Sequence, residues 1–273
     1  MDAFLETTAM VDLIFKDAVR RATIEDTILG CQTKYSSEYV RMEMKRGVLS
    51  YWVLLYNKCV ECEKLSEVFE YIQRLGAGPA RNRASSILES LALFFKSVED
   101  ESVGVLGDGA LCGEFVKAQI AAFLRTRIRH SWRAFEKEVD VVLDDVGCFR
   151  GSKRLEGPRL VNDRFENSLG NCDDNKPEGC GLRDFLERHR TECERVLGAL
   201  TSLKEPDSET SRRVTALKEV LRVCNRPVSR TNCWRLGDVN LALEAPVGSA
   251  VVTHNRKHFE PICAAIGKGL LWY

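Results

Sequence analysis

Acidic and amide side chains near the two ends of the sequence have the chemistry and the positions expected of a divalent-cation site. Glu6 directly follows the apolar residues 3–5, and Asn255 lies in a polar turn after the apolar residues 250–252. Asp238 falls in the first turn of an expected helix, where the helix dipole favours a carboxylate. A hydrolase that activates water against a phosphodiester needs several such oxygen ligands, because a divalent cation holds their negative charges together.

Taken one at a time, these residues have ordinary structural interpretations. Glu6 and Glu43 are common surface or helix-start carboxylates, which the helix dipole stabilises without any metal. His258 and Phe259 follow the Asn255 turn, and we expect the phenylalanine to anchor the core and the histidine to be its hydrogen-bonded polar neighbour. A shared site therefore depends on the fold bringing distant acidic residues together.

Apolar periodicity predicts the elements that would position these side chains. Residues 3–5 and 250–252 are predicted to be short strands, and parallel strands of an α/β sheet present ligands at their carboxyl ends. Glu6 and Asn255 both stand at such ends. Elsewhere apolar residues recur every three or four positions, which predicts helices over 10–19, 36–49, 65–75, 84–98, 112–143, 182–203, 211–224 and 236–243.

Residues 147–181 break this helical pattern. Glycine, proline, asparagine and aspartate cluster at 157–158 and 171–177, and we predict an irregular excursion of the kind that is often functional or mobile. The glycine-rich stretch 104–109 lacks the Lys-Ser/Thr pair that grips phosphate and magnesium in a nucleotide-binding loop. We expect a turn between helices there.

The composition is that of an ordinary soluble globular protein. The 273 residues are 44% apolar and 29% charged, which suits one large domain or one domain carrying an insertion. Forty basic residues balance forty acidic ones, so a nucleic acid would have to be held by a local patch. We expect neither a signal peptide nor a membrane span, and the odd count of eleven cysteines suggests a reducing cytoplasm.

Zinc is one interpretation of the cysteines near the irregular excursion. Structural zinc sites usually show close Cys-x-x-Cys pairs, and the one such pair, Cys59 and Cys62, lies in a predicted helix without a matching second pair. Free buried thiols are the simpler interpretation, because cysteine packs as a small apolar residue. Both remain open for Cys148, Cys172, Cys180 and Cys193.

Three arginines form a stripe on the helix predicted over residues 112–143. Arg125, Arg129 and Arg133 recur at every fourth position beside an apolar face, and like charges at this spacing repel by roughly a few tenths of a kcal/mol per pair. An RNA backbone would offset that repulsion. Solvent, or ion pairs to acidic helices elsewhere in the chain, would offset it equally well, and the sequence leaves these alternatives open.

The N-terminal part resembles the PIN-domain ribonuclease family in two segments. Residues 4–12, FLETTAMVD, resemble the family's opening strand and helix, with Glu6 where the family has an aspartate. Residues 39–46, YVRMEMKR, resemble the helix that supplies its second acidic residue, here Glu43.

The C-terminal part resembles the same family in the same order. Residues 236–243, LGDVNLAL, resemble its third acidic helix, with Asp238, and residues 249–259 resemble its final strand and turn, with Asn255 where the family often has an aspartate. The resemblance implies an α/β/α PIN-like sandwich with a small parallel sheet, predominantly helical overall. Its core would combine residues 1–58 and 214–273.

Residues 59–213 would then be a helical segment, partly core and partly insertion. The implied activity is that of an endoribonuclease that hydrolyses RNA phosphodiesters, single-stranded RNA first among them, with water activated by Mg²⁺ or Mn²⁺. Glu6, Glu43 and Asp238 would be metal ligands, and Asn255 a ligand or a group that positions water.

The glutamate at position 6 and the asparagine at position 255 support a second hypothesis. A PIN-like scaffold that has lost catalysis would bind RNA or a protein partner, or a second copy of the chain, through its helical insertion. A metal-dependent phosphatase with similar carboxylates is a third hypothesis. Metal dependence and turnover distinguish the nuclease from the binding scaffold.

Overall fold

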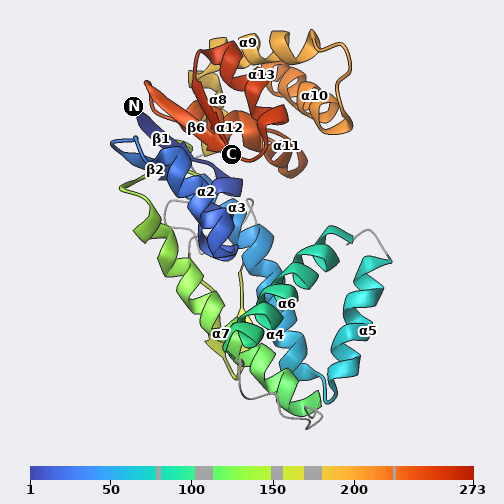
Figure 1. The fold of residues 1–273 in the computed structure, drawn as a ribbon. Coiled ribbons are helices and arrows are strands. Elements are labelled where there is room, and N and C mark those ends of the chain that lie inside the picture. The colour runs from blue at the N-terminus through green and yellow to red at the C-terminus, as the bar shows by residue number, and fades with distance from the viewer. Residues whose placement is uncertain (78–80, 102–112, 149–155, 169–179, 224–225) are drawn as a thin grey trace.

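A computed structural model describes residues 1–77, 81–101, 113–148, 156–168, 180–223 and 226–273. Figure 1 shows an α/β part, which holds both chain ends, and a helical arm that extends from it. The chain is mostly helical around a five-stranded parallel sheet. The expected mixed α/β fold with a predominance of helix is confirmed at this level.

The five-stranded sheet lies at the centre of the α/β part, and all of its neighbouring strands run parallel. Its strand order is β3-β2-β1-β6-β7. The neighbouring strands β1 and β6 inside this sheet are almost wholly buried and mostly apolar, as expected where helices cover both faces of a sheet. The strands are β1 (Asp2–Leu5), β2 (Lys34–Ser37), β3 (Val141–Leu143), β6 (Ser249–Thr253) and β7 (Gly269–Trp272).

Helices pack against the sheet on two sides. The connections from β1 to β2 and from β6 to β7 cross the sheet in opposite directions, so right-handed crossovers place their helices on opposite faces. One side carries α1 (Thr7–Phe15), α2 (Ala18–Ile28) and α3 (Glu38–Met44). The other carries α8 (Gly181–Arg188), α9 (Arg190–Thr201), α10 (Ser208–Arg222), α11 (Arg230–Arg235), α12 (Gly237–Glu244) and α13 (Arg256–Ile266).

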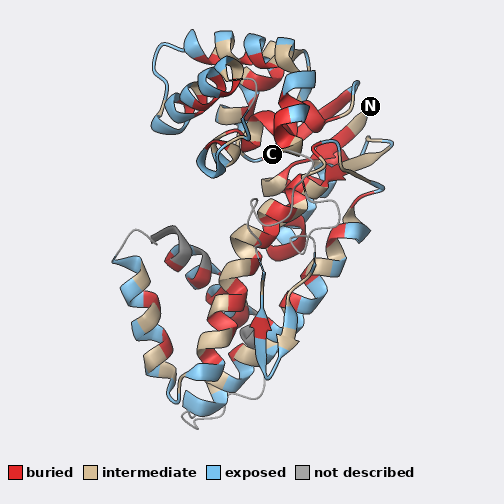
Figure 2. Cartoon of the chain, turned by 180° about the vertical axis from the view of Figure 1, so that it is seen from behind, coloured by how far each residue is buried: buried red, intermediate tan, exposed pale blue. Residues whose placement is uncertain are grey.

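The helical arm continues from α3 through a π-helical turn, η1 (Lys45–Leu49). Its helices are α4 (Ser50–Glu61), α5 (Leu65–Gly76), α6 (Arg81–Glu101) and α7 (Gly113–Glu138). The α4 helix packs along α7 and α6, and Figure 2 shows buried residues on the facing sides of the arm helices. Among the helices described here, none is long and apolar enough to cross a membrane.

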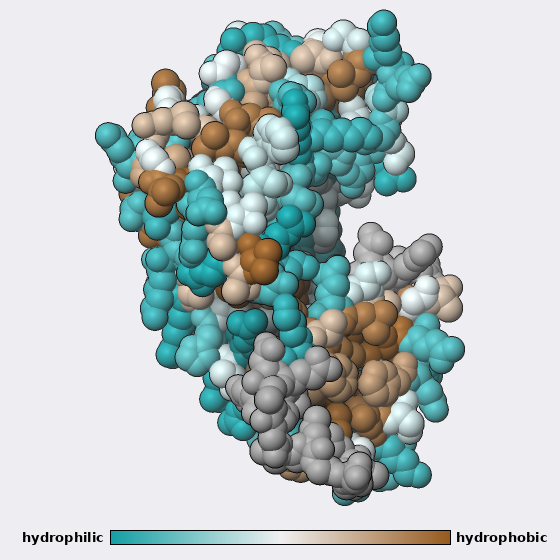
Figure 3. Space-filling model, viewed as in Figure 1, coloured by the Kyte–Doolittle hydropathy of each residue, from teal (hydrophilic) through white to brown (hydrophobic). Residues whose placement is uncertain are grey.

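Some apolar side chains of the arm remain exposed. Phe69 on α5 and Leu88 and Phe95 on α6 are each more than two-fifths exposed, and Figure 3 shows apolar surface over this part of the arm. In the same view a notch separates the arm from the α/β part.

Residues 141–143, predicted to end a helix, instead form the edge strand β3. The α7 helix ends at Glu138, and the backbone N–H of Asp140 then donates to Lys34 O at 2.8 Å, while the Asp140 carboxylate accepts from the Lys34 N–H. The apolar spacing of α7 runs on into Val-Val-Leu, so periodicity alone could not separate the strand from the helix. A strand from the predicted insertion thus joins the central sheet.

The segment predicted to be wholly irregular contains a β-hairpin. Its strands are β4 (Arg159–Val161) and β5 (Arg164–Glu166), which pair antiparallel. Asn162 and Asp163 join them, both at positive φ, as a two-residue type I′ turn requires. The strands β2 and β7 were also not predicted, and the glycine-rich stretch 104–109 lies outside the described residues.

Candidate functional site

The direction in which successive strands are added to the sheet reverses between β1 and β6. This switch point is where a ligand is expected. From β1 the chain builds outward through β2 to β3, and it later returns to add β6 and β7 on the other side. In open α/β sheets the carboxyl ends of the strands at such a switch form a binding crevice. Glu6 directly follows β1 and Asn255 follows β6 by two residues, so both stand at this point.

Glu6 caps the N-terminus of α1 and is buried, with 2% of its surface exposed. One carboxylate oxygen accepts a hydrogen bond from the Thr8 backbone N–H at 2.8 Å, and the other accepts from the Thr8 hydroxyl. Burial raises the pKa of Glu6 to about 7, and the negative charge of Asp238 adds to the rise. A nearby cation would favour the ionised carboxylate.

Glu43 reaches the same region from α3. The Thr7 hydroxyl donates to Glu43 Oε2 at 2.5 Å, which ties α3 to the start of α1. Removal from water raises the pKa of Glu43 to about 7, with Asp238 adding to the rise and Arg46 opposing it. Gly237 permits this arrangement, because a Cβ atom there would lie only 2.7 Å from Glu43 Oε1.

Asp238 supplies the third carboxylate, from the first turn of α12. Its negative charge acts on both glutamates, since it raises the pKa of each. The guanidinium of Arg213, a residue of α10 that is only 5% exposed, contacts the Asp238 carboxylate. Nε and Nη1 of Arg213 have no hydrogen-bond partner among the described residues. The fold therefore brings Asp238 within electrostatic reach of the two glutamates that the sequence pattern singled out.

Asn255 joins the site through His258. Its amide nitrogen lies 2.8 Å from His258 Nδ1, and His258 Nε2 lies 3.2 Å from Asp207 Oδ2. The same ring is 3.5 Å from Asp238 Oδ2. Asp238 and Asp207 together raise the pKa of His258. The expectation that His258 is a hydrogen-bonded polar neighbour is confirmed, and its contacts connect Asn255 to Asp238.

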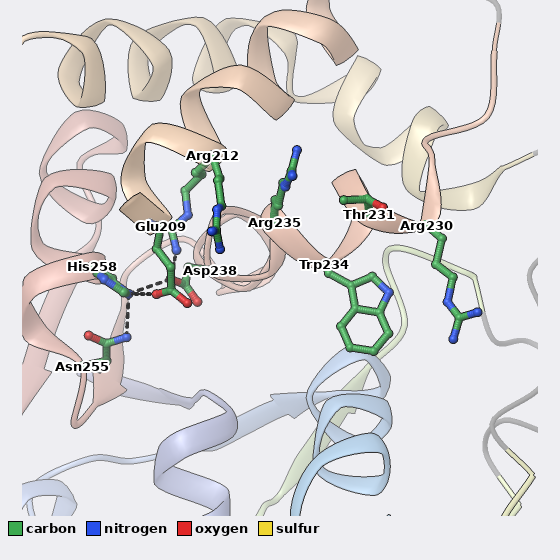
Figure 4. Close-up of a pocket in the computed structure, with 10 residues that line it drawn as sticks. Glu209, Arg212, Arg230, Thr231, Trp234, Arg235, Asp238, Asn255 and His258 are labelled. Atoms are coloured by element: carbon green, nitrogen blue, oxygen red, sulfur yellow. Dashed lines mark hydrogen bonds and ion pairs between the residues drawn. The ribbon is translucent and has the colours of Figure 1, made fainter. Parts of the chain in front are cut away.

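An open pocket of about 680 Å³ lies beside Asp238, Asn255 and His258. In Figure 4 the acidic residues gather with His258 at one end, two arginines lie in the middle, and Trp234 and Arg230 lie at the other end. The pocket is thus acidic at the end nearest the carboxylates and basic along the rest of its length. The lining residues are Glu209, Arg212, Arg213, Arg230, Thr231, Trp234, Arg235, Asp238, Asn255 and His258.

The donor types at this site are those that a hard divalent cation prefers. Glu6 and Glu43, both with raised pKa, sense the charge of Asp238, with Arg213 and Arg46 as positive charges nearby, and carboxylate oxygens are the ligands that Mg²⁺ and Mn²⁺ prefer. Within the described ranges, no three His, Cys, Asp or Glu side chains stand in metal-binding geometry. Thr7 instead holds Glu43, and Arg213 holds Asp238.

The arginines that the sequence suggested for RNA binding lie on the arm. Arg125, Arg129 and Arg133 are exposed along α7 and do not line the pocket. Trp132, on the same helix, is covered by the Arg41 guanidinium at 4.4 Å from the ring centroid. The stripe is therefore a surface feature separate from the carboxylate site.

Of the four cysteines considered for zinc, Cys172 lies outside the described residues. The Leu182 N–H donates to Cys148 Sγ at 3.0 Å, and Cys193 is buried in the core. Burial raises the pKa of the Cys193 thiol to about 12, which disfavours the thiolate that zinc binds. Cys193 thus fits the buried-thiol interpretation.

Several residues that complete the site have no signal in the sequence. Arg213 lies on a predicted helix and Trp234 on α11, which was not predicted. Nothing in the spacing of either residue shows which acidic residue or which pocket it reaches. Thr7 and Thr8 had a weak local signal, because short hydroxyl side chains are common where a helix starts. Their hydrogen bonds to the two glutamates became visible only in the structure.

In comparisons with known proteins, no family model matches the chain, no curated protein matches its sequence and no solved structure matches its fold.

Proposed function

We propose that the protein is a metal-dependent endoribonuclease that hydrolyses RNA phosphodiesters at the Glu6, Glu43 and Asp238 site. One observation carries the proposal: the carboxyls of Glu6 and Glu43 are removed from water, which raises the pKa of each to about 7, and both also sense the negative charge of Asp238. A divalent cation would relieve this repulsion and compete with protons for the same oxygens. The resemblance of four segments to PIN-domain ribonucleases supplies the reaction class.

Each residue of the site then has a defined task. Mg²⁺ or Mn²⁺ bound there supplies activation of water and neutralisation of the charge that develops on the phosphate. Glu6, Glu43 and Asp238 would hold the ion. Asn255, whose amide is fixed by His258, offers an oxygen ligand or orients the attacking water. Arginines along the adjoining pocket bind the RNA phosphates.

Replacing Asp238 with asparagine tests the proposal, because the change removes the charge and keeps the shape. We expect cleavage of a labelled single-stranded RNA in saturating Mn²⁺ to fall by about 100-fold or more, the usual cost of losing one electrostatic group. The matched control is Glu244→Gln. Glu244 is also buried with a pKa raised to about 8, but it bonds Ser37 on another part of the sheet. Full activity of Asp238→Asn would sink the assignment.

The Arg213 contact favours an alternative function, a catalytically impaired PIN-like scaffold that binds RNA or a protein partner. In that case the guanidinium permanently supplies the positive charge that Asp238 would otherwise take from a metal. Titrating Mn²⁺ into the wild-type protein separates the two functions. The scaffold would bind RNA whether or not Mn²⁺ is present and would not cleave it. The nuclease would cleave RNA, and only when Mn²⁺ is present.

A further inference from the structure

The pocket beside the carboxylates contains positive charge that the metal site does not use. Arg212 and Arg230 are exposed and Arg235 is partly exposed. None of these three makes an ion pair with a residue in the described part of the chain, whereas Arg213 is paired with Asp238. Guanidinium groups that line one wall without acidic partners form a site for an anion, and phosphate suits their forked geometry.

Trp234 stands at the opposite end of the pocket from Asp238, Glu209 and His258 and is 44% exposed. The Arg46 guanidinium lies over its ring, and Arg230 lies 5.9 Å from the ring centroid. Such cation–π contacts fix the orientation of an exposed aromatic ring. The positive charge of Arg46 also opposes the rise in the pKa of Glu43. The ring is therefore held in place by a residue that belongs to the carboxylate site.

The order of groups along the pocket matches the order of groups in a nucleic-acid strand. Figure 4 shows an acidic end, then Arg212 and Arg235, then Trp234. A strand cut at the acidic end would next present its neighbouring phosphates to the arginines and then a base to the indole. Aromatic side chains stack readily on unpaired bases, and a base inside a duplex has no free face to offer.

We propose that this pocket binds single-stranded RNA, with an unpaired base stacked on Trp234 and adjoining phosphates on Arg212 and Arg235. The choice of single-stranded RNA rests on the proposed function, and the inference adds the pocket and the residues that bind the base and the phosphates. Double-stranded RNA is excluded from this mode because its bases stack on one another.

A fluorescence titration in EDTA tests the pocket without any cleavage. The anisotropy of a fluorescently labelled short oligouridylate should rise on binding, and Trp234→Ala should weaken the affinity about tenfold or more. Trp272→Ala is the matched control, because Trp272 is 55% exposed and also lies against an arginine, Arg256 at 4.7 Å, but outside the pocket. Trp234→Phe keeps a ring and should retain most of the affinity, which separates stacking from loss of folding.

Salt dependence tests the phosphate contacts. Arg212→Gln and Arg235→Gln should each weaken binding and lower the slope of log affinity against log salt by about one. Unchanged oligouridylate affinity in Trp234→Ala overturns the inference, and so does equal affinity for an RNA duplex. If the wild type cleaves RNA but Trp234→Ala binds it normally, only the proposed RNA-binding role of the pocket is wrong. If Trp234→Ala binds RNA more weakly but the wild type does not cleave it, only the proposed nuclease activity is wrong.

Discussion

Arg213 and Asp238 form an ion pair in which the arginine side chain is almost wholly buried and the aspartate is partly exposed to the pocket. The guanidinium of Arg213 neutralises the negative charge of Asp238, which a bound metal ion would otherwise do. Arginine and metal are therefore competing partners for Asp238. The pair is also incompletely satisfied, because Nε and Nη1 of Arg213 have no partner among the described residues, so drawing Asp238 away to a metal would leave the buried guanidinium still less satisfied.

Arg213→Gln should strengthen Mn²⁺ binding while weakening the fold. We expect affinity to rise roughly tenfold, the worth of one charge-assisted hydrogen bond, and the free energy of unfolding to fall by about 2 kcal/mol. Calorimetric titration and urea denaturation measure the two effects. Arg183→Gln is the control: Arg183 is equally buried and donates to Val220 O, so it should lose stability without any gain in Mn²⁺ affinity. Unchanged Mn²⁺ affinity in Arg213→Gln would show that the pair does not compete with metal.

Glu6 couples stability to pH in the metal-free protein. Its pKa is about 7 in the fold against 4.5 ordinarily, so between these values the folded protein holds a proton that the unfolded chain has released. This contribution to stability is complete below pH 4.5 and is lost as pH rises through 7. The unfolding free energy should fall by roughly 2–3 kcal/mol for this group between pH 5 and 8. Urea denaturation across that range measures it.

Glu6→Gln should remove the Glu6 share of this pH dependence and leave the shares of Glu43 and Glu244, whose pKa values are also raised. Saturating Mn²⁺ should restore stability at pH 8 in the wild type but not in Glu6→Gln. A wild-type profile that rises steadily from pH 5 to 8 in EDTA contradicts the assignment.

The elements predicted from the sequence are those with long or strongly apolar patterns. The strands β1 and β6 and most helices carry enough periodic residues to be recognised from local sequence alone. The strands β2, β3 and β7 have three or four residues each, and their partners are distant in the sequence. Only pairing identifies them, and a single sequence does not record pairing.

The residues of the candidate site likewise fall into those that the sequence indicated and those that it did not. Glu6 and Asn255 were recognisable because they follow strands, and Glu43 and Asp238 because their segments resemble a family pattern. Arg213 and Trp234 reach the pocket through the packing of α11 against both α10 and α12. Their roles depend on the angles between helices, which local sequence does not specify.

Gly237→Ala should disrupt the site although the residue carries no chemistry. The added Cβ would lie 2.7 Å from Glu43 Oε1, so α12 or Glu43 must move, and the Thr7 hydrogen bond to Glu43 is strained. Because the clashing atom is the end of a flexible side chain, we expect stability to fall by about 1 kcal/mol at most and Mn²⁺ binding to weaken as the Glu43 carboxylate turns away. Thermal denaturation and metal titration measure both.

Gly198→Ala is the control for that substitution. Gly198 lies inside α9, and a Cβ there would meet nothing within 4 Å, so alanine should stabilise the helix by roughly 0.5–1 kcal/mol. If Gly237→Ala proves as harmless as Gly198→Ala, the close approach of α12 to Glu43 is not required by the fold.

The arginine stripe on α7 and the Trp234 pocket should contribute to RNA binding in different ways. If Arg125, Arg129 and Arg133 contact phosphates, changing all three to glutamate weakens affinity and lowers its salt dependence, because fewer counterions are released. Trp234→Ala should weaken affinity with its salt dependence unchanged, since stacking releases few ions. Titrations of oligouridylate at several salt concentrations distinguish the two effects.

A second triple variant controls for the change in net charge. Arg195→Glu, Lys204→Glu and Lys218→Glu make the same charge change at exposed positions that do not line the pocket. If both triple variants lower affinity equally, the α7 stripe acts only through the overall field of the protein. If only the α7 variant lowers the salt slope, the stripe contacts RNA directly, and the substrate extends from the pocket onto the arm.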